Sequence, residues 1–369
     1  MDVSDPKNPS LVGELATPPN GQPVELRAVP DLGLLVVANL SPTASVLTYD
    51  VSDCRHPKPL GSLGLSAVPH EFFLWRDSLV PPSPGGVRGV ARLLMFAAMF
   101  HDRPDLQVVD LSDPSRPQRV ATWTAAEERA SGTLHSLSVS RDGRRAYLAL
   151  WDGGFLVADS SDFQSPMTNP QLRLIRDPSG FSPALGQNVH SAVLLTDPRY
   201  VLLTQEVYEC PFAGVMIADV ANEARPQSVG RFELPENDPA CDGLPQADAV
   251  FTAHNPLVVG NLVFLTWYGG GLQVLDVSDV TQPRRVGLFV PNGEGAAARS
   301  YVGTYPVQMW SYPILREGLI YAADIQSGLY ILEYTGPGAE EVKKVALAEG
   351  NAATEANEEN PGTSATPPE

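Results

Sequence analysis

Four of the six histidines of this chain stand at one repeated position of the sequence. They open the apolar segments PHEFFLW, LHSLSVS, VHSAVLL and AHNPLVV, and they are His70, His135, His190 and His254. Glu25 occupies the same place in VELRAV. Neutral imidazoles and carboxylates are ligands that suit Zn, Cu, Fe, Mn or Ni. The pattern indicates a transition-metal site at these five residues, and the alternative is that each histidine bonds backbone groups of its own repeat.

Further polar residues are expected near these histidines because they follow the second predicted strand of their repeats. Glu206 and Asp324 are the candidates for orienting metal ligands or for acid–base catalysis. Ordinary turn roles are the alternative. The chain lacks a Walker loop, a Gly-x-Ser-x-Gly elbow and a His-Glu-x-x-His helix motif, so the sequence leaves open whether the protein is an enzyme.

The histidines are positioned by a unit in which apolar runs end in an Asp-containing turn. Val- and Leu-rich runs favour β-strands, and the repeated Asp accepts backbone N–H groups in a tight turn. Calcium binding is the alternative, which we disfavour because each turn holds few acids. The unit therefore predicts a small antiparallel meander. The turns read DVSD, DLSD, DSSD, DVAN and DVSD at residues 50–53, 110–113, 159–162, 219–222 and 276–279.

The two ends of the sequence read as two parts of one further unit. Residues 2–15 form the end of a unit without its beginning, and residues 318–335 form the beginning of a unit without its end. We therefore predict an all-β fold, a single β-propeller closed by the N-terminal strand joining the last blade, which removes exposed sheet edges. Six blades are predicted, with seven as the alternative, and their cores are residues 24–64, 70–123, 135–176, 190–234, 254–290, and 311–335 joined to 2–15.

The recurring pattern Gly-Leu-x-Val-x-Asp-Val-Ser-Asp, followed by x-Pro-x-x-Val-Gly, resembles the LVIVD repeat. The resemblance covers roughly residues 2–335. It implies a β-propeller, frequently in an exported protein, and it says almost nothing about chemistry. In a propeller the start of each inner strand lies beside the central channel, so the metal site is expected at the channel mouth.

Two functions are compatible with this sequence. The first is a metal-dependent enzyme or metal-binding protein of unknown substrate. The second is a non-catalytic extracytoplasmic module that binds a protein or a glycan and has structural histidines. The small molecule, protein or glycan is expected on the face that carries the long loops between blades, because variable loops on a rigid scaffold often bind ligands. These loops are residues 124–134, 176–189, 235–253 and 291–309.

Composition restricts the partners further. The formal net charge of −18 argues against nucleic acid, which demands a basic surface. No run of about 18 apolar residues is present, so we predict no membrane span, and we expect a monomer. Residues 336–369 are rich in Pro, Ala and Glu, and we predict them to be a disordered acidic tail after a propeller domain of residues 1–335.

The cysteines bear on the compartment. Cys210 and Cys241 are predicted to lie on one face, close enough for a disulfide, and Cys54 on the opposite face. A disulfide and the family resemblance both indicate an extracytoplasmic protein. The sequence begins without a signal peptide, so the cytoplasm is the alternative location.

Overall fold

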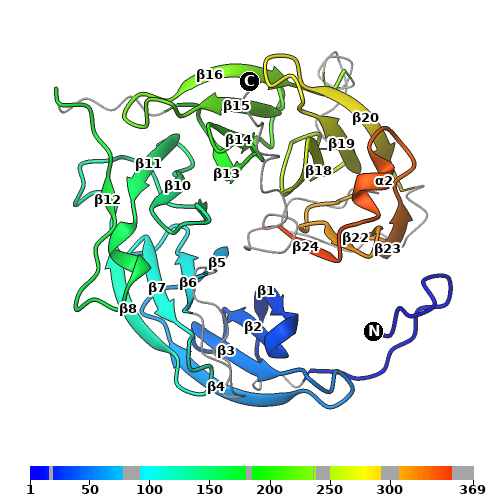
Figure 1. The fold of residues 1–369 in the computed structure, drawn as a ribbon, viewed down its shortest axis with the longest axis horizontal. Coiled ribbons are helices and arrows are strands. Elements are labelled where there is room, and N and C mark those ends of the chain that lie inside the picture. The colour runs from blue at the N-terminus through cyan, green and yellow to red at the C-terminus, as the bar shows by residue number, and fades with distance from the viewer. Residues whose placement is uncertain are drawn as a thin grey trace, which may run out of the picture. The chain divides into compact units, whose positions relative to one another are not determined.

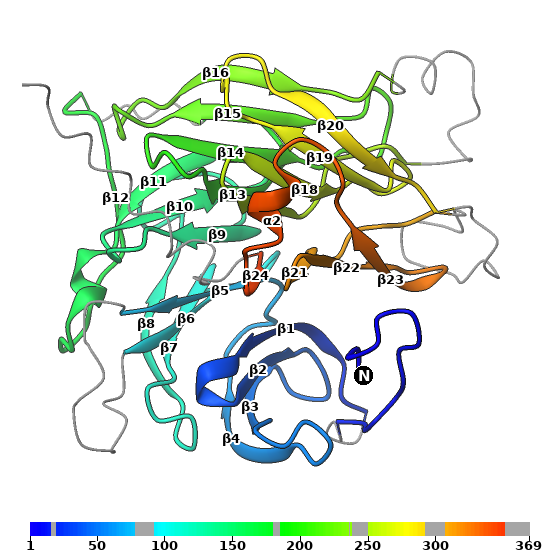
Figure 2. The same cartoon turned by 45° about the vertical axis from the view of Figure 1, so that its right-hand side comes forward.

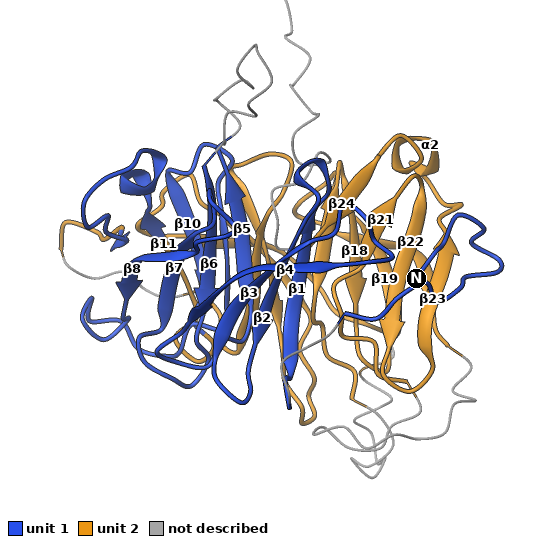
Figure 3. Ribbon diagram, turned by 90° about the horizontal axis from the view of Figure 1, so that it is seen from below, with its two compact units in different colours: residues 1–150, 158–174 blue, residues 151–157, 175–369 orange. Residues whose placement is uncertain are grey.

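The structure is a computed structural model, and it describes residues 1–15, 20–77, 92–179, 185–235, 237, 250–291 and 307–350. Within these ranges the strands form six four-stranded sheets (Figure 1). The chain divides into two compact units: residues 1–150 with 158–174, and residues 151–157 with 175–369 (Figure 3). The predicted all-β class and the six repeated sheets are confirmed.

Unit 1 contains two complete sheets and most of a third. Strand β11 of the third sheet spans the boundary between the units. The strands are β1 (Pro23–Val29), β2 (Leu34–Asn39), β3 (Ser45–Asp50) and β4 (Lys58–Gly64); β5 (Phe72–Arg76), β6 (Leu93–Ala98), β7 (Leu106–Asp110) and β8 (Gln118–Trp123); and β9 (Ser136–Val139), β10 (Arg145–Ala149), β11 (Phe155–Asp159) and β12 (Arg173–Leu174).

Unit 2 contains the other three sheets. Its largest buried side chains include Trp267, Tyr268 and Phe264, which are fully buried. The strands are β13 (Val189–Leu194), β14 (Tyr200–Gln205), β15 (Val215–Asp219) and β16 (Gln227–Phe232); β17 (Pro256–Val259), β18 (Leu262–Thr266), β19 (Leu272–Asp276) and β20 (Arg284–Phe289); and β21 (Ile314–Arg316), β22 (Leu319–Asp324), β23 (Gly328–Glu333) and β24 (Leu347–Glu349).

The repeated Asp has the turn role that its position predicts. In each of the five turns its Oδ1 atom accepts the backbone N–H of the second residue after it, which is a local side-chain turn. The distances are 2.9 Å for Asp50–Ser52, 2.8 Å for Asp110–Ser112, 2.9 Å for Asp159–Ser161, 2.8 Å for Asp219–Ala221 and 2.9 Å for Asp276–Ser278.

The last sheet is completed differently from the prediction. Its fourth strand is β24, which pairs with β21 so that Leu315 lies opposite Ala348 (Figure 2). Residues 1–15 contain no strand, and Asp2 and Ser10 pair with one another instead. The structure therefore does not show the predicted closure by the N-terminal strand. Strand β24 lies at the β21 edge of the sheet and not at the β23 edge, where the fourth strand of the repeat would pair.

Residues 336–350 are ordered, although the sequence predicts a disordered tail. They include α2 (Ala339–Val342) and β24, and Val342 and Ala348 are buried in one cluster with Leu315. Burial of these side chains offsets the entropy cost of ordering the segment. Residues 351–369, which complete the predicted tail, lie outside the described residues.

Among the described residues, the helical segments whose bounds the structure gives are short. They are η1 (Pro30–Leu32), η2 (Ser161–Gln164) and α2. Among the described residues, no helix is long and apolar enough to cross a membrane.

Candidate metal centre

Three of the four repeated histidines are anchored by the same backbone hydrogen bond. In each case the histidine N–H donates to the last carbonyl of the second strand in its sheet. The pairs are His70–Ala98 at 2.9 Å, His135–Ala149 at 2.8 Å and His254–Thr266 at 3.0 Å. His190 lies inside β13, where the register shifts between Val189 and Ser191. The equivalence inferred from the sequence is therefore a structural equivalence for His70, His135 and His254.

In unit 2, two histidines meet a buried carboxylate. His254 Nε2 lies 3.4 Å from Glu206 Oε1, and His190 Nε2 lies 3.8 Å from Glu206 Oε2. The ring centroids of the two histidines are 3.9 Å apart. One ligand atom from each of the three residues lies within 4.8 Å of the others. Sequence reasoning had given Glu206 an outer role, whereas its two carboxylate oxygens lie 3.4 and 3.8 Å from the Nε2 atoms of the two histidines.

These separations suit a single metal ion. Ligand atoms held at about 2.0–2.2 Å from one ion are about 3 to 4 Å from each other. The two nitrogen–oxygen separations of 3.4 and 3.8 Å lie inside this range. Two imidazoles and one carboxylate are also a donor set that leaves further coordination positions open. The residues of unit 2 therefore fit a transition metal with only small adjustments.

His254 is held in the form that can bind a metal. Its Nδ1 lies 2.6 Å from the Trp310 carbonyl oxygen, to which it donates, so the lone pair is on Nε2. Burial lowers the pKa of His254 to about 3, although the bond to Trp310 acts in the opposite direction. The imidazole is therefore neutral at physiological pH. A carbonyl behind a ligating histidine fixes its tautomer and its ring orientation.

Glu206 is held by two phenols. Tyr208 donates to its Oε1 at 2.7 Å, and Tyr268 donates to the same oxygen. Burial raises the pKa of Glu206 to about 7, and the two phenol hydrogen bonds lower it only in part. A carboxyl group with this pKa exchanges its proton near neutral pH, which suits either metal binding or proton transfer.

The backbone on both sides of Glu206 is fixed as well. Its N–H donates to the Asn188 carbonyl at 3.0 Å. The Thr252 hydroxyl accepts from the Val207 N–H at 2.9 Å and donates to the Gln205 carbonyl at 3.1 Å. These backbone hydrogen bonds fix the segment that carries the carboxylate.

Asp324 has a supporting role. Its carboxylate accepts backbone N–H groups from Gln308 at 2.6 Å, Gln326 at 2.9 Å and Ser327 at 2.7 Å. Met309, between Gln308 and Trp310, pairs with both Tyr268 and Asp324. Asp324 thus holds the segment whose Trp310 carbonyl orients His254, and it is not among the residues grouped around Glu206. The sequence predicted Asp324 at the end of the second strand of its repeat, but it did not show which groups Asp324 bonds.

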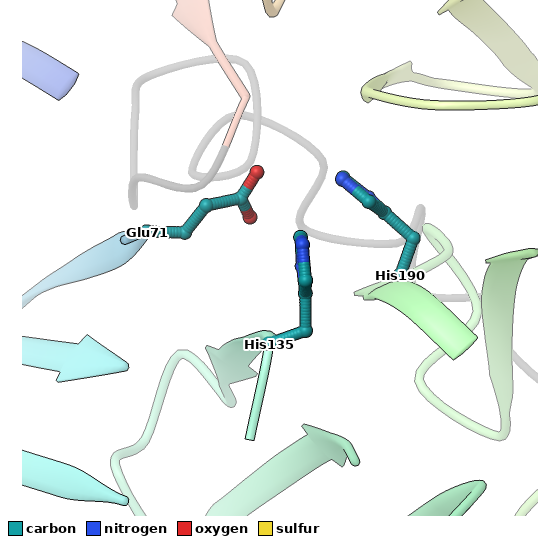
Figure 4. A group of neighbouring side chains, drawn as sticks. All are labelled: Glu71, His135 and His190. Atoms are coloured by element: carbon teal, nitrogen blue, oxygen red, sulfur yellow. The ribbon is translucent and has the colours of Figure 1, made fainter. Parts of the chain in front are cut away.

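Unit 1 holds the other two repeated histidines. His70 Nε2 and His135 Nε2 are 2.9 Å apart, with their rings nearly perpendicular at 78°. The side chains of Glu71 and His135 converge, with ligand atoms within 4.8 Å (Figure 4, which also draws His190 of unit 2). Whether the histidines of both units share one centre stays a prediction.

Glu25 has partners in β1 and β5. It forms a buried ion pair with Arg27, and its Oε2 accepts the Phe72 N–H at 2.6 Å. These contacts hold the Glu25 carboxylate, and its role as a metal ligand stays a prediction. Its register matched that of the histidines, but an arginine two residues later captures the carboxylate.

Two residues near the histidines were missed by sequence reasoning. They are Glu71 and Tyr208, and neither was predicted to lie at the site. The available signal was proximity along the chain, because Glu71 follows His70 and Tyr208 follows Glu206 by two residues.

The cysteines are consistent with an oxidised pair. Cys210 is disulfide-bonded, and Cys54 is free and exposed. The predicted partner, Cys241, lies outside the described residues, so the pairing with Cys210 stays a prediction.

A repeat family matches two parts of the chain. The LVIVD repeat model matches residues 102–124 and 253–289. These two ranges carry LVIVD repeats. The first match covers β7 and β8, and the second covers the whole sheet from β17 to β20 together with His254. The LVIVD resemblance inferred from the sequence is thus confirmed. A search of curated proteins found no match to this chain.

Solved structures with similar folds include β-propellers. The periplasmic gluconolactonase of Pseudomonas aeruginosa has a TM-score of 0.54 and 17% identity, over 87% of this chain and 86% of that chain. The Swd1 β-propeller domain of Myceliophteria thermophila has a TM-score of 0.52 and 12% identity, over 85% and 84%. Hydrazine synthase of Kuenenia stuttgartiensis has a TM-score of 0.52 and 13% identity, over 84% and 76%. At these identities the likeness concerns the fold alone, and the LVIVD-repeat chain has the β-propeller fold with six blades.

Proposed function

We propose that this LVIVD-repeat protein binds a transition-metal ion through His190, His254 and Glu206, and that it is a metal-dependent enzyme of unknown substrate. The observation that carries the proposal is the meeting of two imidazole nitrogens and one buried carboxylate within 4.8 Å. Such a set leaves coordination positions for water or substrate. The same set occurs in zinc hydrolases and in non-haem iron enzymes, so it does not choose between Zn, Cu, Fe, Mn and Ni.

The residues around the ligands have separate tasks in this proposal. The bound ion would activate water or O₂, or polarise a carbonyl or phosphoryl group. The Trp310 carbonyl keeps the His254 lone pair on Nε2. The phenols of Tyr208 and Tyr268 hold one oxygen of Glu206, which leaves Oε2 facing His190. We assign Tyr208 the transfer of a proton between solvent and Glu206, because the residue is 39% exposed and its hydroxyl donates to the carboxylate.

Metal analysis of the purified full chain tests the proposal. We expect a stoichiometric transition metal in the wild type, and we expect His254→Ala and Glu206→Gln to lose the ion at the unit 2 group. His56→Ala is the matched control, because His56 is an exposed histidine that pairs with Asp53 on a repeat turn. A metal-free wild type that folds normally would contradict the proposal. It would favour the alternative, an interaction module for a protein or a glycan with structural histidines.

We also propose an extracytoplasmic location, supported by the disulfide at Cys210, because disulfides persist in oxidising compartments. Mass spectrometry of the protein from its native host, with and without reduction, tests this proposal. A fully reduced Cys210 in the native protein would contradict it. A monomer with a small-molecule, protein or glycan ligand on the face of the long loops completes the proposal.

A further inference from the structure

The histidine pair of unit 1 has a geometry of its own. His70 Nε2 and His135 Nε2 are 2.9 Å apart, and the rings meet at 78°. Each ring therefore presents its outer nitrogen to the other. The backbone fixes both residues in the same way, through the hydrogen bonds to Ala98 and Ala149 described above.

The two nitrogens are close to the separation of two ligands on one ion. Nitrogens bound at about 2.0–2.1 Å to a tetrahedral ion are about 3.3–3.4 Å apart, so the two rings would move apart by about 0.4–0.5 Å to share an ion. The alternative is a direct N–H···N hydrogen bond, in which one imidazole carries its proton on Nε2 and the other accepts it. Experiment can distinguish the two arrangements, because only the first one binds an ion in solution.

The surroundings of the pair also suit an ion. The Phe100 ring lies 4.5 Å from His135 and 5.2 Å from His70 between ring centroids, so one apolar ring covers both imidazoles. The Glu71 side chain is buried beside His135 and supplies a carboxylate oxygen within 4.8 Å of a His135 nitrogen (Figure 4). A buried acid next to paired imidazoles offers negative charge to balance a cation.

We infer that the chain binds a second transition-metal ion, in unit 1, through His70 and His135 with Glu71 as the carboxylate ligand or the charge-balancing neighbour. The ligands proposed for this ion do not include Glu206 or His254. Both sites arise from the same repeated histidine, so duplication of the unit accounts for two metal sites on one chain.

Zinc stoichiometry of the full chain tests the inference. The protein is stripped with a chelator, loaded with excess Zn²⁺, desalted and analysed by mass spectrometry for zinc per chain. We expect two ions in the wild type, and we expect one ion to be lost on His70→Ala, on His135→Ala and, separately, on His254→Ala. His101→Ala is the matched control and should keep both, because His101 is exposed and stacks on the same Phe100 ring.

The outcomes separate this inference from the proposed function. If the wild type binds one ion, and His70→Ala and His135→Ala both retain it, the inference of a second ion is overturned. The proposed site in unit 2 then remains. One ion that is lost on either His135→Ala or His254→Ala would also overturn the inference, since a single ion would then use both pairs. No ion in the wild type would overturn both proposals. Circular dichroism verifies folding, and His70→Ala decides the matter if His135→Ala does not fold.

Discussion

Replacing Glu206 by Gln should stabilise the metal-free protein at alkaline pH. Burial raises the pKa of Glu206 from 4.5 to about 7. A shift of this size corresponds to about 3 kcal/mol between the two protonation states, at 1.36 kcal/mol for each pH unit. The carboxyl group is almost fully buried, so solvent screening reduces this figure little.

The sign follows from the direction of the shift. Because the pKa is higher in the folded state, the protonated group stabilises the fold below about pH 4.5, and this contribution is lost as the pH rises through about 7. Gln cannot ionise, and its carbonyl oxygen still accepts the hydroxyls of Tyr208 and Tyr268. The stability of Glu206→Gln relative to wild type should therefore be near zero at low pH and grow to about 3 kcal/mol by about pH 8.

Urea unfolding in the presence of a chelator, followed by circular dichroism at pH 4.5 and at pH 8, measures this difference. The lowered pKa of His254 makes both proteins less stable as the pH falls below 6.5. This contribution of His254 is common to both proteins and cancels in the difference between their stabilities. Glu209→Gln is the control, because Glu209 is exposed and lies in the same loop. A difference that stays constant with pH, or a Gln variant less stable than wild type at pH 8, would refute the reasoning.

Three further predictions follow from the same contacts. Metal affinity should rise about tenfold for each pH unit up to about 7 and then level off, because the ion displaces the proton of Glu206. A Zn²⁺ titration of the wild type across pH measures this, and an affinity that does not change with pH below about 7 would speak against it. Asp324→Ala should destabilise the protein by about 2 kcal/mol or more in urea unfolding, because three backbone N–H groups lose their acceptor. Asp152→Ala is the control and should leave the stability unchanged, because Asp152 is exposed. Deleting residues 336–369 should lower the melting temperature, because it uncovers the core around Ala348; a calorimetric scan that matches the full chain would show the segment to be dispensable.

Much of the fold could be predicted because its determinants are local and repeated. The carboxylate of Asp276 and the N–H of Ser278 are two residues apart, so the turn is encoded in the DVSD segment itself. The register of His70, His135 and His254 was visible for the same reason, since each stands at one place in the unit.

The parts that could not be predicted depend on partners far along the chain or on competition between neighbours. Strand β24 pairs with β21 across a separation that no local pattern encodes, and its three residues carry little periodicity. Glu25 shared the histidine register, yet Arg27 and the Phe72 N–H take its carboxylate. Glu206 was expected beside the metal ligands, but its contact with His190 and His254 depends on how β13 and β17 are placed.

The most direct test of the central claim is an anomalous-difference map from crystals of the metal-loaded protein. We predict a peak at about 2.0–2.2 Å from His190 Nε2, His254 Nε2 and a carboxylate oxygen of Glu206. A loaded crystal with no peak at these three residues would contradict the account.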